Sequence, residues 1–155
     1  MKKFTFFDDY NAKHQRKTNL LLHAFSTPLY ELGIFTFFSY FRFEFFGLKL
    51  SLGLLLYLFL IVLYLNTHLL LGAVVTVLVA VPFLCALYFS SYSFWIMLML
   101  VLLFLFLSLF LQKIGHKKEK IRNGHKRFSA TFTHLFAKEP FYWAPFFLII
   151  KIFRR

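Results

Sequence analysis

Apolar residues dominate one long central stretch of the chain, and short polar groups interrupt it at regular distances. Residues 50–112 contain no Lys, Arg, Asp or Glu. Since a bilayer core about 30 Å thick takes roughly 20 helical residues, this stretch is long enough for about three crossings. Asn66-Thr67-His68 and Ser90-Ser91-Tyr92-Ser93 divide it. The pattern therefore predicts membrane-spanning helices over residues 48–65, 69–89 and 94–111.

A fourth apolar segment, residues 20–41, precedes these spans. It is interrupted by His23, Pro28 and Glu31, and two alternatives fit it: a crossing, or an amphipathic hairpin in the membrane interface. The basic residues favour the crossing. Five precede the segment, eleven follow the last predicted span, and only two lie between. Because cytoplasmic loops carry the excess of Lys and Arg, two basic ends on the cytoplasmic side require an even number of crossings.

The two ends of the chain complete the predicted fold. Residues 1–19 form a basic cytoplasmic or interfacial segment, and residues 112–155 form a basic tail. The apolar part of the tail, residues 141–150, is too short to cross and is expected to be interfacial or re-entrant. We therefore predict one domain over residues 1–155: an all-α integral membrane protein with a four-span helical bundle and both termini in the cytoplasm.

Composition and charge exclude two other classes of protein. The chain is 60% hydrophobic with 25 Phe among its 155 residues, which is too apolar for a soluble globular domain. Its formal net charge of +12 comes from basic ends around an uncharged middle, which favours a bilayer partner and excludes nucleic acid. Its single cysteine, Cys85, excludes an intramolecular disulfide. We expect a multi-pass protein of the bacterial inner membrane, or of the endoplasmic reticulum if the source is eukaryotic.

Six histidines provide the candidate chemistry. In the four-span topology all of them fall on the cytoplasmic side, and neutral imidazoles that converge there can bind a metal ion. An ordinary solvated role is an open alternative for His125 and His134, and His68 is expected to be a turn residue. The six are His14, His23, His68, His116, His125 and His134.

The spacing of the first two histidines predicts a local bend. His14 and His23 are nine residues apart, so an uninterrupted helix presents them on opposite faces. We expect the chain to bend at Thr18-Asn19, with Asn19 as the cap of a new helix. Gln112 and His116 are four residues apart and share a helix face.

Three groups of residues carry a resemblance to a known family. They are Tyr10-x3-His14-Gln15-x2-Thr18-Asn19-x3-His23-x4-Pro28, then Gln112-x2-Gly115-His116-x2-Glu119-Lys120, then Ala144-Pro145-Phe146-Phe147. In this order and at these spacings they resemble the Mpo1-like family of membrane proteins. The chain departs from the family pattern at Arg16-Lys17 and lacks the proline that usually follows the Glu-Lys pair.

The resemblance implies a multi-span membrane enzyme that depends on iron(II). Such enzymes use O2 to shorten long-chain 2-hydroxy fatty acids by one carbon. By position in the motifs, the metal ligands would be His14, His23 and His116, with His125 or His134 as a possible further ligand. Around them, a second set of side chains would orient the imidazoles. This set is Tyr10, Asn19, Gln112 and Glu119.

Two alternatives to this function remain open. In the first alternative, the chain is a non-catalytic membrane protein whose basic ends bind anionic lipid or a protein partner. In the second, its histidines ligate haem in pairs. Bound iron in the purified protein distinguishes the enzyme from the non-catalytic protein, and a Soret band would indicate haem.

Overall fold

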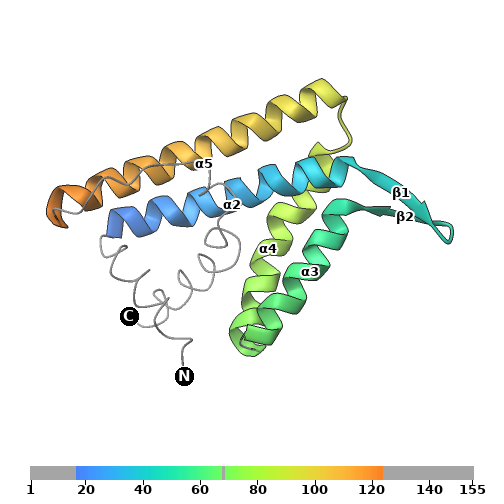
Figure 1. Cartoon of the computed structure of the whole chain (residues 1–155), viewed down its shortest axis with the longest axis horizontal. Helices are drawn as coiled ribbons and strands as arrows, with labels where there is room; N and C mark the ends of the chain where they lie inside the picture. Colours follow the sequence, from blue (N-terminus) through green and yellow to red (C-terminus); the bar gives the residue numbers. More distant parts are fainter. Residues whose placement is uncertain (1–16, 68, 124–155) are drawn as a thin grey trace.

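A computed structural model of the chain describes residues 17–67 and 69–123, and the structural statements below concern these residues. They form four helices and one β-hairpin. In chain order, with the labels of Figure 1, these are α2 (Lys17–Tyr40), β1 (Arg42–Phe45), β2 (Leu48–Ser51), α3 (Leu52–Thr67), α4 (Leu69–Phe89) and α5 (Phe94–Asn123).

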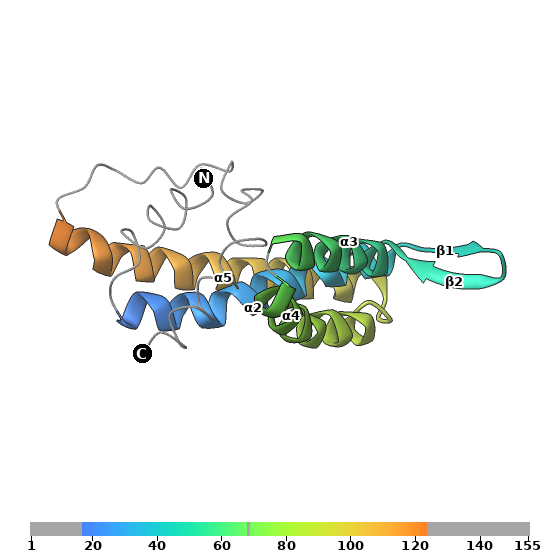
Figure 2. The same ribbon diagram turned by 90° about the horizontal axis from the view of Figure 1, so that it is seen from below.

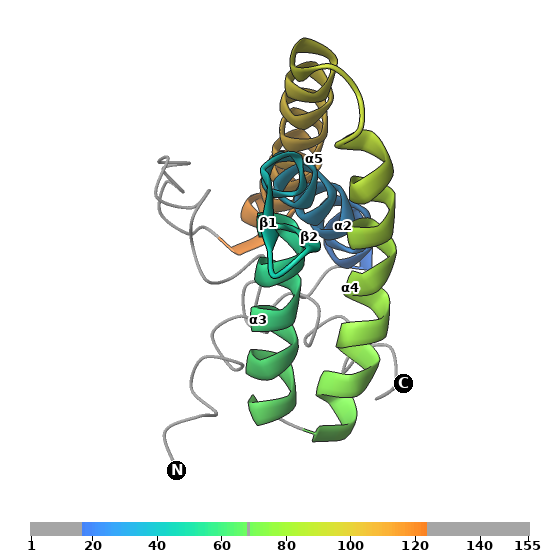
Figure 3. The same cartoon turned by 90° about the vertical axis from the view of Figure 1, so that its right-hand side faces the viewer.

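The helices form two antiparallel pairs that meet at one end. α2 and α5 lie side by side over most of their length, while α3 and α4 form a hairpin steeply inclined to them (Figure 1). The views from below and from the side agree with this arrangement (Figures 2 and 3). α2 contacts all three other helices, so it is the central element of the fold.

The predicted breaks between helices are confirmed. The predicted span over residues 69–89 coincides with α4, α3 ends at Thr67, and residues 90–93 lie between α4 and α5. α2 runs as one continuous helix through Pro28, so residues 20–41 do not form a hairpin, but α2 is not among the described helices that are apolar enough to be candidate spans. Two described segments are long and apolar enough to cross a membrane, namely Leu69–Phe89 and Phe94–Lys117, and Leu52–Asn66 is apolar but shorter.

Two predicted boundaries are wrong. The second span was expected from residue 48, but Leu48–Ser51 is a strand paired with Arg42–Phe45, so a short β-hairpin joins α2 to α3 in a fold that is otherwise helical, as predicted. The turn of this hairpin contains Phe46 and Gly47, both with positive φ, at 50° and 76°. Such a turn matches the twist of paired strands and favours a hairpin. The basic tail, expected from residue 112, begins as a direct continuation of α5 up to Asn123.

Polar and apolar side chains of α2 are arranged opposite to those of a soluble protein. Leu21 and Phe25 are 59% and 68% exposed, whereas Asn19, His23 and Glu31 are buried between helices. Only 33% and 17% of the residues in the two candidate spans are buried within the described part of the chain, so most of their apolar surface is exposed there. Because soluble monomers rarely expose continuous apolar surface of this extent, the arrangement supports a membrane location.

The apolar core lies where α2 meets the α3–α4 hairpin. Phe35 of α2 packs edge-to-face on Phe83 of α4, with ring centres 5.5 Å apart, and Tyr57 of α3 stacks on the same ring at 4.6 Å. Gly72 allows α4 to approach the backbone of α3 at Tyr64 closely. This core fixes the α3–α4 hairpin to α2 but contributes no candidate chemistry.

Candidate metal site between two helices

Small and polar residues line the contact between α2 and α5. The Ser108 hydroxyl of α5 donates a hydrogen bond to the backbone carbonyl of Ser26 in α2, at 2.8 Å. Gln112 lies one turn further along α5, and its side-chain amide donates to the Ser108 hydroxyl at 3.4 Å. Contacts of this kind are typical of helix pairs in membranes, where small residues allow close approach and polar side chains link the helices.

A close approach of the two helices lies one further turn along α5, at Gly115. A methyl group added to Gly115 would meet the Asn19 side chain, with the amide carbon Cγ at 3.3 Å and the oxygen Oδ1 nearer still. Asn19 is fully buried. The missing side chain at Gly115 therefore creates the space that Asn19 fills.

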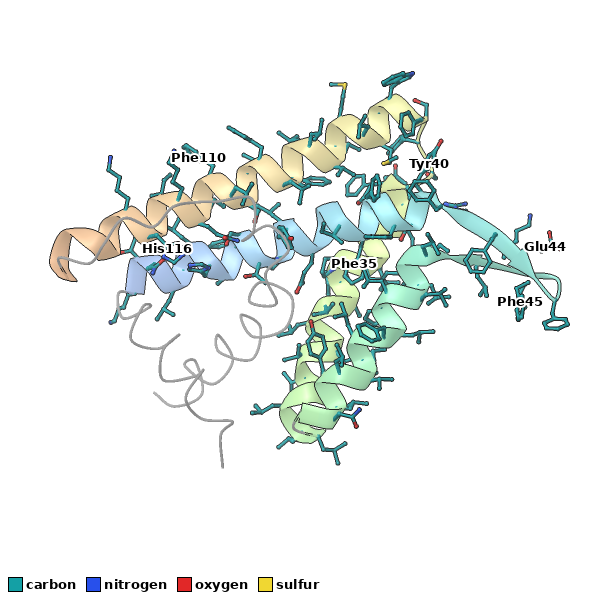
Figure 4. All side chains as sticks on the ribbon, viewed as in Figure 1. Phe35, Tyr40, Glu44, Phe45, Phe110 and His116 are labelled. Atoms are coloured by element: carbon teal, nitrogen blue, oxygen red, sulfur yellow. The ribbon has the colours of Figure 1, made fainter. Side chains whose placement is uncertain are left out.

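This close approach brings two histidines together. His23 lies one turn after Asn19 on α2, and His116 directly follows Gly115 on α5. Their ring centres are 5.0 Å apart and their planes are inclined by 74°. His116 lies on the face of α5 turned toward α2 (Figure 4). His23 is buried and His116 is partly exposed, so the pair lies at the edge of the helix contact.

The separation of the two histidine rings is compatible with ligation of one metal ion. An imidazole nitrogen binds a metal at about 2.1 Å, so two rings in neighbouring coordination positions have centres roughly 4.5–5 Å apart. The observed separation of 5.0 Å agrees with this requirement. Within residues 17–67 and 69–123, no group of three His, Cys, Asp or Glu side chains could hold a metal ion. The described residues thus bring two potential ligands together, and a metal site built on them would need at least one more.

The structure places four of the predicted site residues on the facing sides of α2 and α5: Asn19, His23, Gln112 and His116. Glu119 lies within α5, and its side chain is outside the description. Five further residues named from the sequence lie outside the described residues: Tyr10, His14, His68, His125 and His134.

The expected helix cap at Asn19 is wrong. Asn19 is the third residue of α2, and a cap lies outside the helix that it terminates. Its side chain packs against α5 at Gly115 instead of closing the start of α2. The asparagine therefore contributes to helix packing beside the histidine pair.

The sequence interpretation missed the serines of this contact. Ser26 and Ser108 are completely buried, and the first lies three residues after His23, on the same face of α2. The spacing of polar residues in an apolar segment could have indicated this face. Glu31 is buried on the same helix, and its Oε1 atom has no hydrogen-bond partner within the described part of the chain.

Basic side chains lie on the same two helix ends as the histidine pair. Lys17 begins α2, and Lys113 and Lys117 lie on the last turns of α5 around His116. All three are exposed. Positive charge at this end attracts an anionic group, such as a carboxylate or a lipid phosphate.

Comparison with known proteins finds no match: no family model, no curated protein and no solved structure is similar to the chain. The resemblance to the Mpo1-like family therefore depends on the motifs quoted above.

Proposed function

We propose that this protein is a multi-pass membrane enzyme that uses iron(II) and O2 to shorten long-chain 2-hydroxy fatty acids by one carbon. The observation that carries the proposal is the contact between His23 and His116, whose ring centres are 5.0 Å apart. They are far apart in the sequence and belong to two different motifs of the resemblance. Their separation is compatible with two ligands of a single metal ion.

The proposed ligand set is His23, His116 and His14. Imidazole ligands with open coordination positions suit non-haem iron(II), and the iron supplies the redox chemistry that O2 requires. In this proposal the chain's own residues hold and orient the imidazoles. Asn19 packed on Gly115 sets the distance between α2 and α5, and Ser108, which accepts a hydrogen bond from Gln112, links the two helices through its bond to the Ser26 carbonyl. Tyr10 and Glu119 are proposed as further orienting groups.

The surroundings of the pair are compatible with a lipid substrate. Lys113 and Lys117 provide positive charge for a carboxylate at the helix end. Apolar side chains such as Phe110 on α5 and Leu21 on α2 are exposed, which suits an acyl chain that stays in the bilayer. Each buried methylene contributes about 0.8 kcal/mol, so long chains are expected to bind better than short soluble acids.

The proposed topology has four crossings with both termini in the cytoplasm. Its support is the concentration of basic residues at the two ends of the chain. The antiparallel α2–α5 pair is consistent with it, because the start of α2 and the end of α5 lie at the same end of the pair (Figure 1). In this topology the histidine pair lies at the cytoplasmic surface.

The test begins with metal content. Protein purified in detergent is expected to bind iron stoichiometrically, and His14→Ala, His23→Ala and His116→Ala are each expected to abolish that binding. His68→Ala is the matched control and should keep it, because residue 68 lies between α3 and α4 in the sequence. Gln112→Ala should lower the affinity about 10- to 100-fold, as is usual for groups that orient a ligand.

The second step of the test is turnover. Iron-loaded protein supplied with O2 and a long-chain 2-hydroxy fatty acid should yield the acid one carbon shorter, detected by mass spectrometry. An acid of equal length without the hydroxyl group should react poorly, because it lacks the second oxygen donor next to the carboxylate. Iron-loaded protein that forms no shortened product from any chain length would refute the enzymatic proposal. Metal-free protein would favour the non-catalytic alternative, a basic membrane protein that binds anionic lipid or a partner.

A further inference from the structure

The β-hairpin has one apolar face and one charged face. In the register of the two strands Phe43 pairs with Leu50 and Phe45 pairs with Leu48, whereas Arg42 pairs with Ser51 and Glu44 with Lys49. Residues directly opposite in an antiparallel pair share a face, and neighbours along a strand alternate between faces. One face therefore carries Phe43, Phe45, Leu48 and Leu50. The other carries Arg42, Glu44, Lys49 and Ser51.

The apolar face of the hairpin is not covered by the described part of the protein. Phe45 and Leu48 are 57% and 63% exposed. The hairpin projects beyond the helices in two views at right angles (Figures 1 and 2). Apolar side chains gathered on one face of an amphipathic element normally contact lipid or another protein.

Contacts at the root of the hairpin fix its position relative to the candidate spans. The Arg42 guanidinium donates a hydrogen bond to the Ser90 hydroxyl, in the turn between α4 and α5, at 3.3 Å. Tyr40, just before the hairpin, packs on Phe94 at the start of α5, with ring centres 5.7 Å apart. The root of the hairpin is therefore at the same depth as the turn that joins the two candidate spans.

The turn between α4 and α5 is surrounded by residue types that are typical of a membrane surface. It is flanked by Tyr88, Tyr92 and Trp95, all exposed. Tyrosine and tryptophan concentrate where the hydrocarbon meets water, since their rings are apolar at one end and polar at the other. A hairpin that begins at this depth begins at the surface of the bilayer.

The direction of the side chains decides which face of the hairpin meets the bilayer. The Phe45 side chain points to the side of the hairpin on which α3 and α4 lie, and the Glu44 side chain points to the opposite side (Figure 4). The apolar face is thus turned toward the layer that α4 is suited to cross. The charged face is turned away from it.

A second copy of the chain is a weaker candidate for this face. A stable protein interface needs about 800 Å² from each partner. A large side chain buries about 150–250 Å² when it is fully exposed beforehand, so four partly covered side chains supply roughly half of the required area. Lipid has no such minimum, because it covers whatever apolar surface reaches it.

We propose that the hairpin, residues 42–51, is an interfacial membrane anchor that lies on the bilayer surface at the α4–α5 turn. Its Phe43, Phe45, Leu48 and Leu50 side chains insert below the headgroups, and Arg42, Glu44 and Lys49 face water and the headgroups. The anchor depends on the membrane location of the helices and not on the proposed enzymatic activity.

The test uses single cysteines in the full chain reconstituted in nanodiscs of phosphatidylcholine and phosphatidylglycerol. Cys85→Ser removes the natural thiol, and two neighbouring pairs compare the faces: Glu44→Cys with Phe45→Cys, and Lys49→Cys with Leu48→Cys. A water-soluble maleimide is expected to modify the charged-face thiols about tenfold or more faster than the apolar-face thiols. In SDS all four should react equally. Leu78→Cys, in the middle of α4, is the control for insertion and should be protected.

A second measurement identifies what covers the apolar face. A fluorescent label on Phe45→Cys should be quenched by lipids brominated on their acyl chains, and a label on Glu44→Cys should be quenched much less. Equal maleimide rates on the two faces with Leu78→Cys protected would overturn the anchor while leaving the protein in the membrane. Protection of Phe45→Cys without quenching, or cross-linking of Phe45→Cys between copies, would also overturn it, since protein and not lipid would then cover this face.

Discussion

The contact between Gly115 and Asn19 predicts a specific effect of Gly115→Ala. The new methyl group would overlap the buried Asn19 amide, so α5 must move away from α2 or the amide must leave its place. Overpacking of this kind costs about 1–3 kcal/mol. Alanine in place of glycine within a helix stabilises the folded protein by about 1 kcal/mol, because alanine has the higher helix propensity. The free energy of unfolding is therefore expected to fall by about 1 kcal/mol.

Gly33→Ala provides the matched control, because Gly33 also lies in the contact between α2 and α5. Its added methyl group would meet the Leu105 side chain at 3.2 Å, and the end of a flexible leucine can shift. The helix gain should then balance the packing loss. We expect this variant to unfold at nearly the same free energy as the natural protein, and to keep its metal affinity where Gly115→Ala loses part of it.

A double-mutant cycle separates the contact from other effects of the alanine. Asn19→Ala removes the amide that the new methyl group would overlap, so Gly115→Ala should become neutral or stabilising in that background. We expect a coupling energy of about 1 kcal/mol or more, measured by reversible unfolding in mixed micelles that contain SDS. Independent sites add within about 0.3–0.5 kcal/mol. Additivity within that limit would show that Gly115 does not set the approach of the two helices.

Three further predictions concern the rest of the fold. Gly72→Ala should destabilise the protein more than Gly115→Ala, because its methyl group would meet the Tyr64 backbone, which cannot move aside as a side chain can. Unfolding in the same micelles measures this difference. A neutral effect would contradict the close packing of α3 on α4. Ser108→Ala should cost about 0.5–1.5 kcal/mol through loss of the bond to the Ser26 carbonyl, whereas Ser91→Ala, whose hydroxyl bonds only within its own exposed turn, should cost less; equal losses would argue against the link between helices. Reporters that are active only in the cytoplasm should give signal from both termini, and opposite signals would exclude four crossings.

Much of the helical pattern could be predicted because its cause is local. The polar groups at residues 66–68 and 90–93 interrupt apolar runs of about the length that a bilayer requires, and the helices end there. The hairpin at residues 42–51 was missed although its sequence alternates between apolar and polar residues. The predicted boundary is wrong because Leu48 and Leu50 were counted with the apolar run that follows them. The positive φ angles at Phe46 and Gly47 form the tight turn that ends β1 and begins β2.

The kinds of residues at the candidate site follow from the sequence, whereas the packing of the helices fixes which of these residues meet. His23 and His116 are separated by nearly the whole described chain, and no spacing rule relates positions on different helices. Their contact depends on the antiparallel pairing of α2 with α5 and on the register that Gly115 against Asn19 fixes. A shift of α5 by one turn, about 5.4 Å, would separate the two rings. Helical periodicity fixes which face a residue occupies, whereas only packing fixes which two faces come together.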